Sequence, residues 1–223
     1  MDTGDIKREK GTEKLINYAL SEIEKKYGTG EGDGQSPRRY HNKKHTQDVI
    51  DASVKIAQLA LKKGKIKPSD IPLIQIAASF HDIEQDLGSG LNEQESARKA
   101  EEQMRKEGFS DEEIEKVREM IMATRVSYDE GTMRQFATEC YLTQIITDAD
   151  LSSLGKPYAL YWDRARRLLE ETKGTNNPSE EDITVFMQGQ IAFLQNHRFY
   201  TEEARVLFPH KKDNIRTTQR NLK

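Results

Sequence analysis

The spacing of apolar residues along this chain is helical almost from end to end. Apolar residues recur every three or four positions in one segment after another, which is the period of a helix that buries one face. In LINYALSEIEKKYG (15–28) this stripe consists of Leu15, Tyr18, Ala19, Ile23 and Tyr27. Only CYLTQII (140–146) could pass for a strand, and no partner strand is evident in the sequence. The pattern therefore predicts an all-α fold.

Capping signals and apolar stripes divide the chain into a series of helices. Asn92 is expected to cap one helix, and Ser110 with Glu113 forms a capping box for another. A single domain over residues 1–223 follows from the length and from the lack of an internal repeat. Within it, residues 1–12 are expected to form a flexible N-terminal segment and the glycine-rich residues 28–39 a flexible loop. The predicted helices span 15–28, about 42–63, from 70 onward, 92–106, 111–124, 132–148, 157–172 and 181–195.

Composition narrows the classes of protein to which the chain can belong. Its 35 Lys and Arg nearly balance its 38 Asp and Glu, which argues against a nucleic-acid protein held mainly by basic charge. Cys140 is the only cysteine, so an internal disulfide and a multi-cysteine zinc site are excluded. The sequence contains no apolar run approaching the ~18–20 residues of a membrane span. We therefore expect a soluble, cytoplasmic protein that does not act in a membrane.

Two histidines fall on the inward face of the helix predicted at 42–63. His45 precedes Val49 by four residues and Ala52 by seven, so its side chain points toward the core with theirs. His41 lies one turn earlier on the same side. A lone buried histidine is often just a hydrogen-bonded core residue, and that interpretation stays open for each of them.

A histidine and an aspartate also end the apolar run of the next helix. His81 follows Phe80 at the apolar spacing, and Asp82 adjoins it. Burying these polar groups is costly unless something compensates them, and a divalent cation is an efficient compensation. A fourth ligand could come from Asp148 or Asp150, which lie in a locally apolar stretch.

These residues, taken with their flanks, resemble the HD-domain superfamily of metal-dependent phosphohydrolases, whose members are all-α. The stretch YHNKKHTQDV (40–49) is also similar to one in cyclic-nucleotide phosphodiesterases of that superfamily. The chain is closest to the small stand-alone predicted HD phosphohydrolases with a YHNxxH motif, over roughly residues 15–222. The matching pieces are Tyr40–His45, Phe80–Asp82, Asn92–Ala97, Ile121–Thr124, Asp148–Gly155 and the tail IRTTQRNL (215–222).

The resemblance implies a ligand set and a general acid. His45, His81, Asp82 and Asp150 would hold the ion, which would polarise a phosphoryl oxygen and acidify a water molecule. His41 matches the phosphodiesterase histidine that protonates the leaving oxygen. The alternative for His41 is a supporting hydrogen bond within the site.

Two further carboxylates match catalytic positions, and Asp148 has a supporting role by the same resemblance. The stringent-response hydrolases of the superfamily carry HDxxED, whereas this chain reads HDIEQD, so Gln85 replaces the first acid and Asp86 matches the second. Glu95 could position the attacking water, or it could be an exposed residue of an acidic helix. Asp148 could hydrogen-bond a ligand histidine and fix its tautomer.

Four residues are candidates for substrate binding. Tyr40 and Asn42 would orient the site or line its mouth, although Asn42 is equally suited to cap the helix that follows. Arg125 and Lys156 are the best candidates to hold phosphate charge, although most cations in so charged a chain are merely solvated.

The resulting hypothesis is a metal-dependent phosphohydrolase that cleaves a phosphate ester bond of a nucleotide or related small phosphorylated metabolite by a metal-activated water. The alternatives are a non-catalytic nucleotide-sensing HD domain and a single-strand nuclease, for which the basic tail at 210–223 offers little support. The sequence has no histidine between Asp82 and Asp150, which favours one ion per chain over a di-iron oxygenase site. Mn, Fe, Co, Ni, Zn and Mg all remain open as the metal, and so do the substrate and a homo-oligomeric state.

Overall fold

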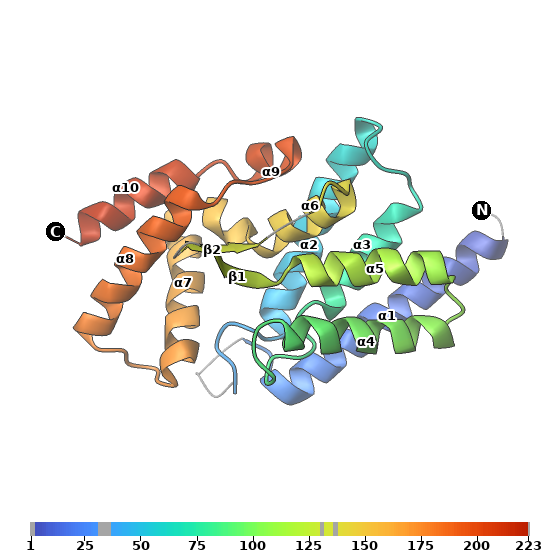
Figure 1. Cartoon of the computed structure of the whole chain (residues 1–223), viewed down its shortest axis with the longest axis horizontal. Helices are drawn as coiled ribbons and strands as arrows, with labels where there is room; N and C mark the ends of the chain where they lie inside the picture. The colour runs from blue at the N-terminus through green and yellow to red at the C-terminus, as the bar shows by residue number, and fades with distance from the viewer. Residues whose placement is uncertain (1–2, 31–36, 130–131, 136–137, 223) are drawn as a thin grey trace.

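Helices make up nearly all of the regular structure, as the apolar spacing predicts. The computed structural model describes residues 3–30, 37–129, 132–135 and 138–222. The fold is an all-α helical bundle with one short hairpin (Figure 1). The elements are α1 (Thr3–Tyr27), α2 (Lys43–Lys62), α3 (Asp70–Phe80), α4 (Leu91–Lys106), α5 (Asp111–Ala123), β1 (Val126–Asp129), β2 (Thr132–Gln135), α6 (Tyr141–Asp150), the 3-10 helix η1 (Ser152–Gly155), α7 (Tyr158–Lys173), α8 (Glu180–Asn196), α9 (Glu202–Leu207) and α10 (Lys211–Asn221).

Helix α3 lies at the centre of the main core. It packs against α1, α2, α5 and α6, and almost every residue from Leu73 to Phe80 is buried. A helix that is apolar on all sides is suited to such a position, whereas α2 buries only the stripe that the sequence predicts. The N-terminal end of α2 and the C-terminal ends of α3 and α6 meet in the interior, so residues at these three ends lie within reach of one another.

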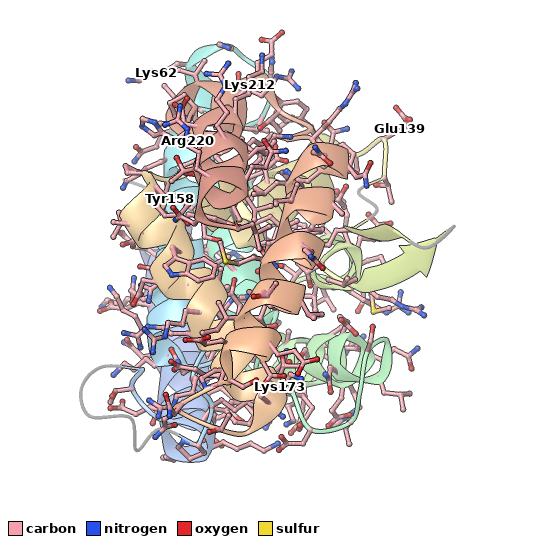
Figure 2. The ribbon with its side chains drawn as sticks, turned by 90° about the vertical axis from the view of Figure 1, so that its left-hand side faces the viewer. Lys62, Glu139, Tyr158, Lys173, Lys212 and Arg220 are labelled. Carbon is pink, nitrogen blue, oxygen red and sulfur yellow. The ribbon has the colours of Figure 1, made fainter. Side chains whose placement is uncertain are left out.

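Helices α7, α8 and α10 form a second layer with a small core of its own. Leu154, Tyr161, Ala165 and Leu194 are its buried members. Figure 2 shows these three helices in front of the rest of the chain, with Tyr158 and Lys173 marking the two ends of α7. One side of α7 faces the loop that leads into α2, because Glu171 bonds to the main chain of residues 40 and 41.

The hairpin corrects the prediction of a helix over 132–148. Strands β1 and β2 pair antiparallel, with Val126 opposite Gln135, and the helix begins only at Tyr141. The segment CYLTQII is therefore largely helical and not a strand. Residues such as Val126 and Thr132 favour extended backbone. Pairing between the two short strands satisfies the hydrogen-bonding groups of their backbones.

Several boundaries also differ from the prediction. The N-terminal segment is helical from Thr3, and Thr12 is buried, so the first helix begins well before the predicted Leu15. Tyr18 is 37% exposed, although the other four residues of its predicted stripe are buried. Asn92 lies inside α4, which is capped by Gly90. The capping box at Ser110 is confirmed.

Part of the predicted flexible loop at 28–39 lies outside the described residues, which resume at Pro37. Among the residues that the structure describes, no helix has the combination of length and apolar character that crossing a bilayer requires.

Candidate metal centre

Four side chains from three helix ends converge in the interior. His45 lies in the first turn of α2, His81 and Asp82 directly follow α3, and Asp150 is the last residue of α6. The contacts are His45 Nε2 to Asp82 Oδ2 and to Asp150 Oδ1, both 3.2 Å; His81 Nε2 to Asp82 Oδ2, 3.1 Å, and to Asp150 Oδ1, 3.5 Å; and His45 Nε2 to His81 Nε2, 3.4 Å.

The chemistry and spacing of these atoms suit a cation. The His81 Nδ1–H donates to the carbonyl of Ala78 at 2.8 Å, so a neutral His81 ring presents its Nε2 lone pair to the other three ligand atoms. An ion bound at about 2.0–2.2 Å holds its neighbouring ligands about 3.0–3.5 Å apart, which is the range found here. The His45, His81 and Asp82 group could thus hold a metal, and Asp150 contacts both of its imidazoles.

Without a bound ion, protons on the two imidazoles would balance the charges of the two carboxylates. Burial disfavours the charged form of every member, yet the adjacent carboxylates raise the pKa of His45 and raise that of His81 well above its usual value. Burial is likewise overcome at the carboxylates, where the two imidazoles lower the pKa of Asp82 and that of Asp150. The cluster therefore attracts positive charge strongly.

Two glutamines contact the carboxylates on the side away from the rings. Gln85 Nε2 donates to Asp82 Oδ1 at 2.7 Å. Gln135 Nε2 donates to Asp150 Oδ2, and it arrives from strand β2. The sequence analysis treats Gln85 only as a replaced acid and does not identify Gln135, because the hairpin that delivers it is predicted as helix.

His41 is bound to a carboxylate that the sequence analysis missed. Its Nδ1 lies 2.6 Å from Glu171 Oε1, and its backbone N–H donates to Glu171 Oε2 at 3.0 Å. Arg38 Nη1 donates to the same carboxylate at 2.9 Å. Burial would raise the pKa of Glu171, but the bond to His41 and the backbone donors lower it to about 2. Glu171 lies 130 residues from His41, and no local motif marks it.

The ring of Tyr40 lines the cluster. Its centroid lies 4.6 Å from the ring of His45 and 4.8 Å from that of His41. Burial and the charges of Asp150 and Asp82 raise the pKa of the phenol, so Tyr40 stays neutral. These contacts agree with the prediction that Tyr40 borders the site.

Asn42 caps α2, which confirms the helix-cap alternative of its two predicted roles. Its Oδ1 accepts from the backbone N–H of Lys44 at 3.0 Å and of His45 at 3.2 Å. Its Nδ2 donates to the carbonyls of Arg38 and Arg39. Asn42 is 2% exposed, and both the oxygen and the nitrogen of its amide are hydrogen-bonded. The side chain therefore holds the backbone at His45 in place and has no group left for a ligand.

Asp86 and Glu95 take part in ion pairs and not in the cluster. Asp86 bonds to Arg38 at 2.7 Å and to Lys26 at 2.9 Å. Glu95 pairs with Arg98 at 2.7 Å on the outer face of α4, as its surface alternative predicts. The structure gives neither carboxylate a contact that would support catalysis.

Of the two predicted phosphate-binding cations, Lys156 has the better position. Arg125 is exposed and lies against Gly90. Lys156 is partly buried, and burial together with nearby cations lowers its pKa, against the opposing effect of Asp48. Asp48 accepts from Arg164 at 2.7 Å, and the Lys44 Nζ atom lies 3.4 Å from the same carboxylate. We call Lys44, Lys156 and Arg164 the basic rim.

Asp148 does not contact a ligand histidine, contrary to its predicted supporting role. It is fully buried and accepts from the N–H of Tyr200 at 2.8 Å, and from the N–H and hydroxyl of Thr201 at 2.7 and 2.6 Å. Burial raises its pKa to about 6 in spite of these bonds. Asp150, not Asp148, therefore faces the histidines.

The similarity to known proteins lies in the fold. The crystal structure of Bacillus subtilis YpgQ in complex with ADP superposes with a TM-score of 0.60 at 16% identity, over 97% of this chain and 95% of that one. The selenomethionine form of YpgQ gives a TM-score of 0.59 at 15% identity, over 97% and 94%. No family model and no curated protein sequence matches this chain. At such identities the agreement shows a shared fold alone.

Proposed function

We propose that this chain is an HD-type, metal-dependent phosphohydrolase that cleaves a phosphate ester bond of a nucleotide or related small phosphorylated metabolite. The observation that carries the proposal is the convergence of four side chains, in which Nε2 of His45 and Nε2 of His81 each lie 3.1–3.5 Å from one carboxylate oxygen of Asp82 and one of Asp150. The ADP bound to YpgQ, a protein of similar fold, supports a nucleotide as the ligand.

These four side chains would hold one divalent ion. Bound there, the ion would supply Lewis-acid polarisation of a phosphoryl oxygen and a lower pKa for water. The chain contributes a buried, preorganised set of ligands, since none of the four side chains is more than 13% exposed. Preorganised ligands need no rearrangement when charge develops on the phosphoryl group.

His41 and Glu171 would supply the proton for the leaving oxygen. Glu171 accepts the Nδ1–H of His41, which leaves Nε2 as the nitrogen that holds and delivers a proton. The bond from His41 Nδ1 to Glu171 fixes the tautomer and the orientation of the ring, as a buried carboxylate does beside a catalytic histidine. The ring of His41 lies 5.9 Å from that of His45, so the acid is next to the metal position.

The basic rim would hold the phosphate groups that do not react. Lys44, Lys156 and Arg164 surround Asp48, and Arg164 also pairs with Asp163 at 3.3 Å, so this patch has three cations against two carboxylates. Lys44 directly precedes His45 in the first turn of α2, so the rim would lie beside the metal position. Bidentate and charge-assisted contacts of this kind are the usual means of binding phosphate.

Metal analysis combined with a substrate panel tests the proposal. The purified protein is loaded with each candidate divalent ion, and phosphate or nucleoside release is measured from nucleoside mono-, di- and triphosphates, cyclic nucleotides and a single-stranded oligonucleotide, with and without chelator. Asp82→Ala should lose both the ion and turnover, whereas Asp86→Asn, four residues along, should keep both. Turnover that ignores the chelator would refute the proposal. Nucleotide binding without any turnover would instead favour a sensing domain.

A further inference from the structure

We propose that Gln85 and Gln135 are positioning residues whose carboxamides turn the carboxylates of Asp82 and Asp150 toward the metal position. This inference rests on the proposed function, because it assigns the residues that set the geometry of that same site.

The two carboxylates have the same arrangement of contacts, although they come from different helices. In Asp82, Oδ2 lies 3.1–3.2 Å from both imidazole Nε2 atoms and Oδ1 accepts from Gln85 at 2.7 Å. In Asp150, Oδ1 lies 3.2–3.5 Å from the same two nitrogens and Oδ2 accepts from Gln135. Each carboxylate therefore presents one oxygen to the centre while an amide holds the other. Rotation of either carboxylate would break its bond to the glutamine.

Gln135 is itself fixed in place. Its side chain is buried, with 6% of the residue exposed, and its Nε2 also donates to the carbonyl of Thr124 at 2.7 Å. Its main-chain carbonyl accepts from the hydroxyl of Tyr200 at 2.8 Å. Both amide hydrogens are thus directed at acceptors, which fixes the orientation of the carboxamide and through it that of Asp150.

Gln85 is held through its main chain. Its backbone N–H donates to the hydroxyl of Tyr27 at 2.8 Å and lies 3.1 Å from Glu84 Oε1. Its side chain reaches back three residues to Asp82. One glutamine therefore acts locally and the other from a distant hairpin, yet they orient the two aspartates alike.

The neutrality of the carboxamide matters for the charge of the centre. A lysine or arginine in the same place would draw carboxylate charge away from the ion, and a glutamate would repel the aspartate. With neutral imidazoles, the ligands His45, His81, Asp82 and Asp150 carry a total charge of −2, which one divalent ion balances. Supporting hydrogen bonds of this kind are commonly worth a factor of about 10–100 in metal affinity.

Metal titration of the intact protein tests the role of the glutamines without any substrate. The dissociation constant for Mn²⁺ or Co²⁺ is measured by competition with a chromophoric chelator for the parent, Gln85→Met, Gln85→Glu and Gln135→Met. The exposed glutamine of α4, in Gln94→Met, is the matched control. We expect at least about 10-fold weaker binding for the first three variants and no change for the control. The visible absorption spectrum of the Co²⁺-loaded variants should change as well, because the carboxylates are reoriented. The melting temperature of metal-free Gln85→Met should stay the same as that of the metal-free parent.

The outcomes separate this inference from the proposed function. If the parent binds Co²⁺ and the variants of Gln85 bind it equally well with an unchanged spectrum, the positioning role is wrong and the metal site stands. If the parent binds no divalent ion, the proposed function fails and the inference fails with it. Should Gln135→Met not fold, the two Gln85 variants decide the question, since Met removes the donor and Glu reverses its polarity at nearly constant size.

Discussion

The metal centre and the α7 side of the site are built differently. The ligands lie at the ends of α2, α3 and α6, within the main core, and their partners are imidazoles, carboxylates and neutral amides. The α7 side consists of Glu171, Arg164 and the neighbouring Lys156, which contact the loop before α2 and its first turns. The centre is buried and pairs two carboxylates with two imidazoles, whereas the α7 side is partly open and carries excess positive charge. In the proposed function, the first region would bind the ion and the second would handle phosphate and protons.

The largest expected effect breaks the centre and leaves the α7 side intact. Asp150→Ala should weaken metal binding by more than about 100-fold, beyond the loss expected from a supporting contact. Asp148→Ala, two residues earlier, should leave the affinity within about 3-fold. It should instead lower the stability by about 2–4 kcal/mol, because the N–H groups of Tyr200 and Thr201 lose their acceptor.

Chelator competition and chemical denaturation measure these two effects. If Asp148→Ala lost the metal and Asp150→Ala kept it, the assignment of the fourth ligand would be reversed.

The next largest effect breaks the α7 side and leaves the centre intact. Glu171→Gln should lower kcat by about 10–100-fold with the metal content unchanged, because His41 loses the carboxylate that fixes its tautomer and ring orientation. Glu170→Gln is the matched control, since Glu170 lies next to it on α7 and pairs with Arg166. A loss of bound metal in Glu171→Gln would show that the two regions are not separable.

A smaller effect is expected at the basic rim. Lys156→Gln should raise KM by about 5–10-fold with little change in kcat, because it removes a charge that holds substrate in the ground and transition states alike. Lys62→Gln, at the exposed end of α2, should change neither constant. Steady-state kinetics at two salt concentrations measure the effect, and an unchanged KM would exclude Lys156 from substrate binding.

The smallest expected effect is a change in stability with pH. The pKa of Glu171 is about 2 in the folded chain against an ordinary 4.5, so its stabilising contribution is complete above about pH 4.5 and is lost as the pH falls toward 2. The difference in unfolding free energy between the parent and Glu171→Gln should therefore shrink by roughly 2–3 kcal/mol from pH 6 to pH 2.5. Urea denaturation at both pH values measures it, and a constant difference would contradict the pairing with His41.

The candidate metal centre and the α7 side also differ in how far they can be predicted from the sequence. His45, His81, Asp82 and Asp150 are predicted because each lies in a local apolar pattern or a short motif, and the helical fold follows from the same spacing. Glu171 and Arg164 lie on a charged helix, where nothing local distinguishes them from solvated neighbours. Gln135 was missed because a hairpin, stabilised by pairing between its own two strands, replaces the expected helix. Contacts made across distant elements are the ones that periodicity does not reveal.

The close approach of Gly30 to Asn42 makes the entrance to α2 intolerant of change. A Cβ atom on Gly30 would lie 2.1 Å from Asn42 Oδ1, the atom that caps α2 and accepts from the N–H of His45. The φ of +76° at Gly30 disfavours any other residue as well. Arg167 donates to the carbonyl of Gly30, so the same residue also joins α7 to this entrance. A single methyl group added at Gly30, fifteen positions before His45, would therefore displace the cap of α2 and with it the first of the candidate metal ligands.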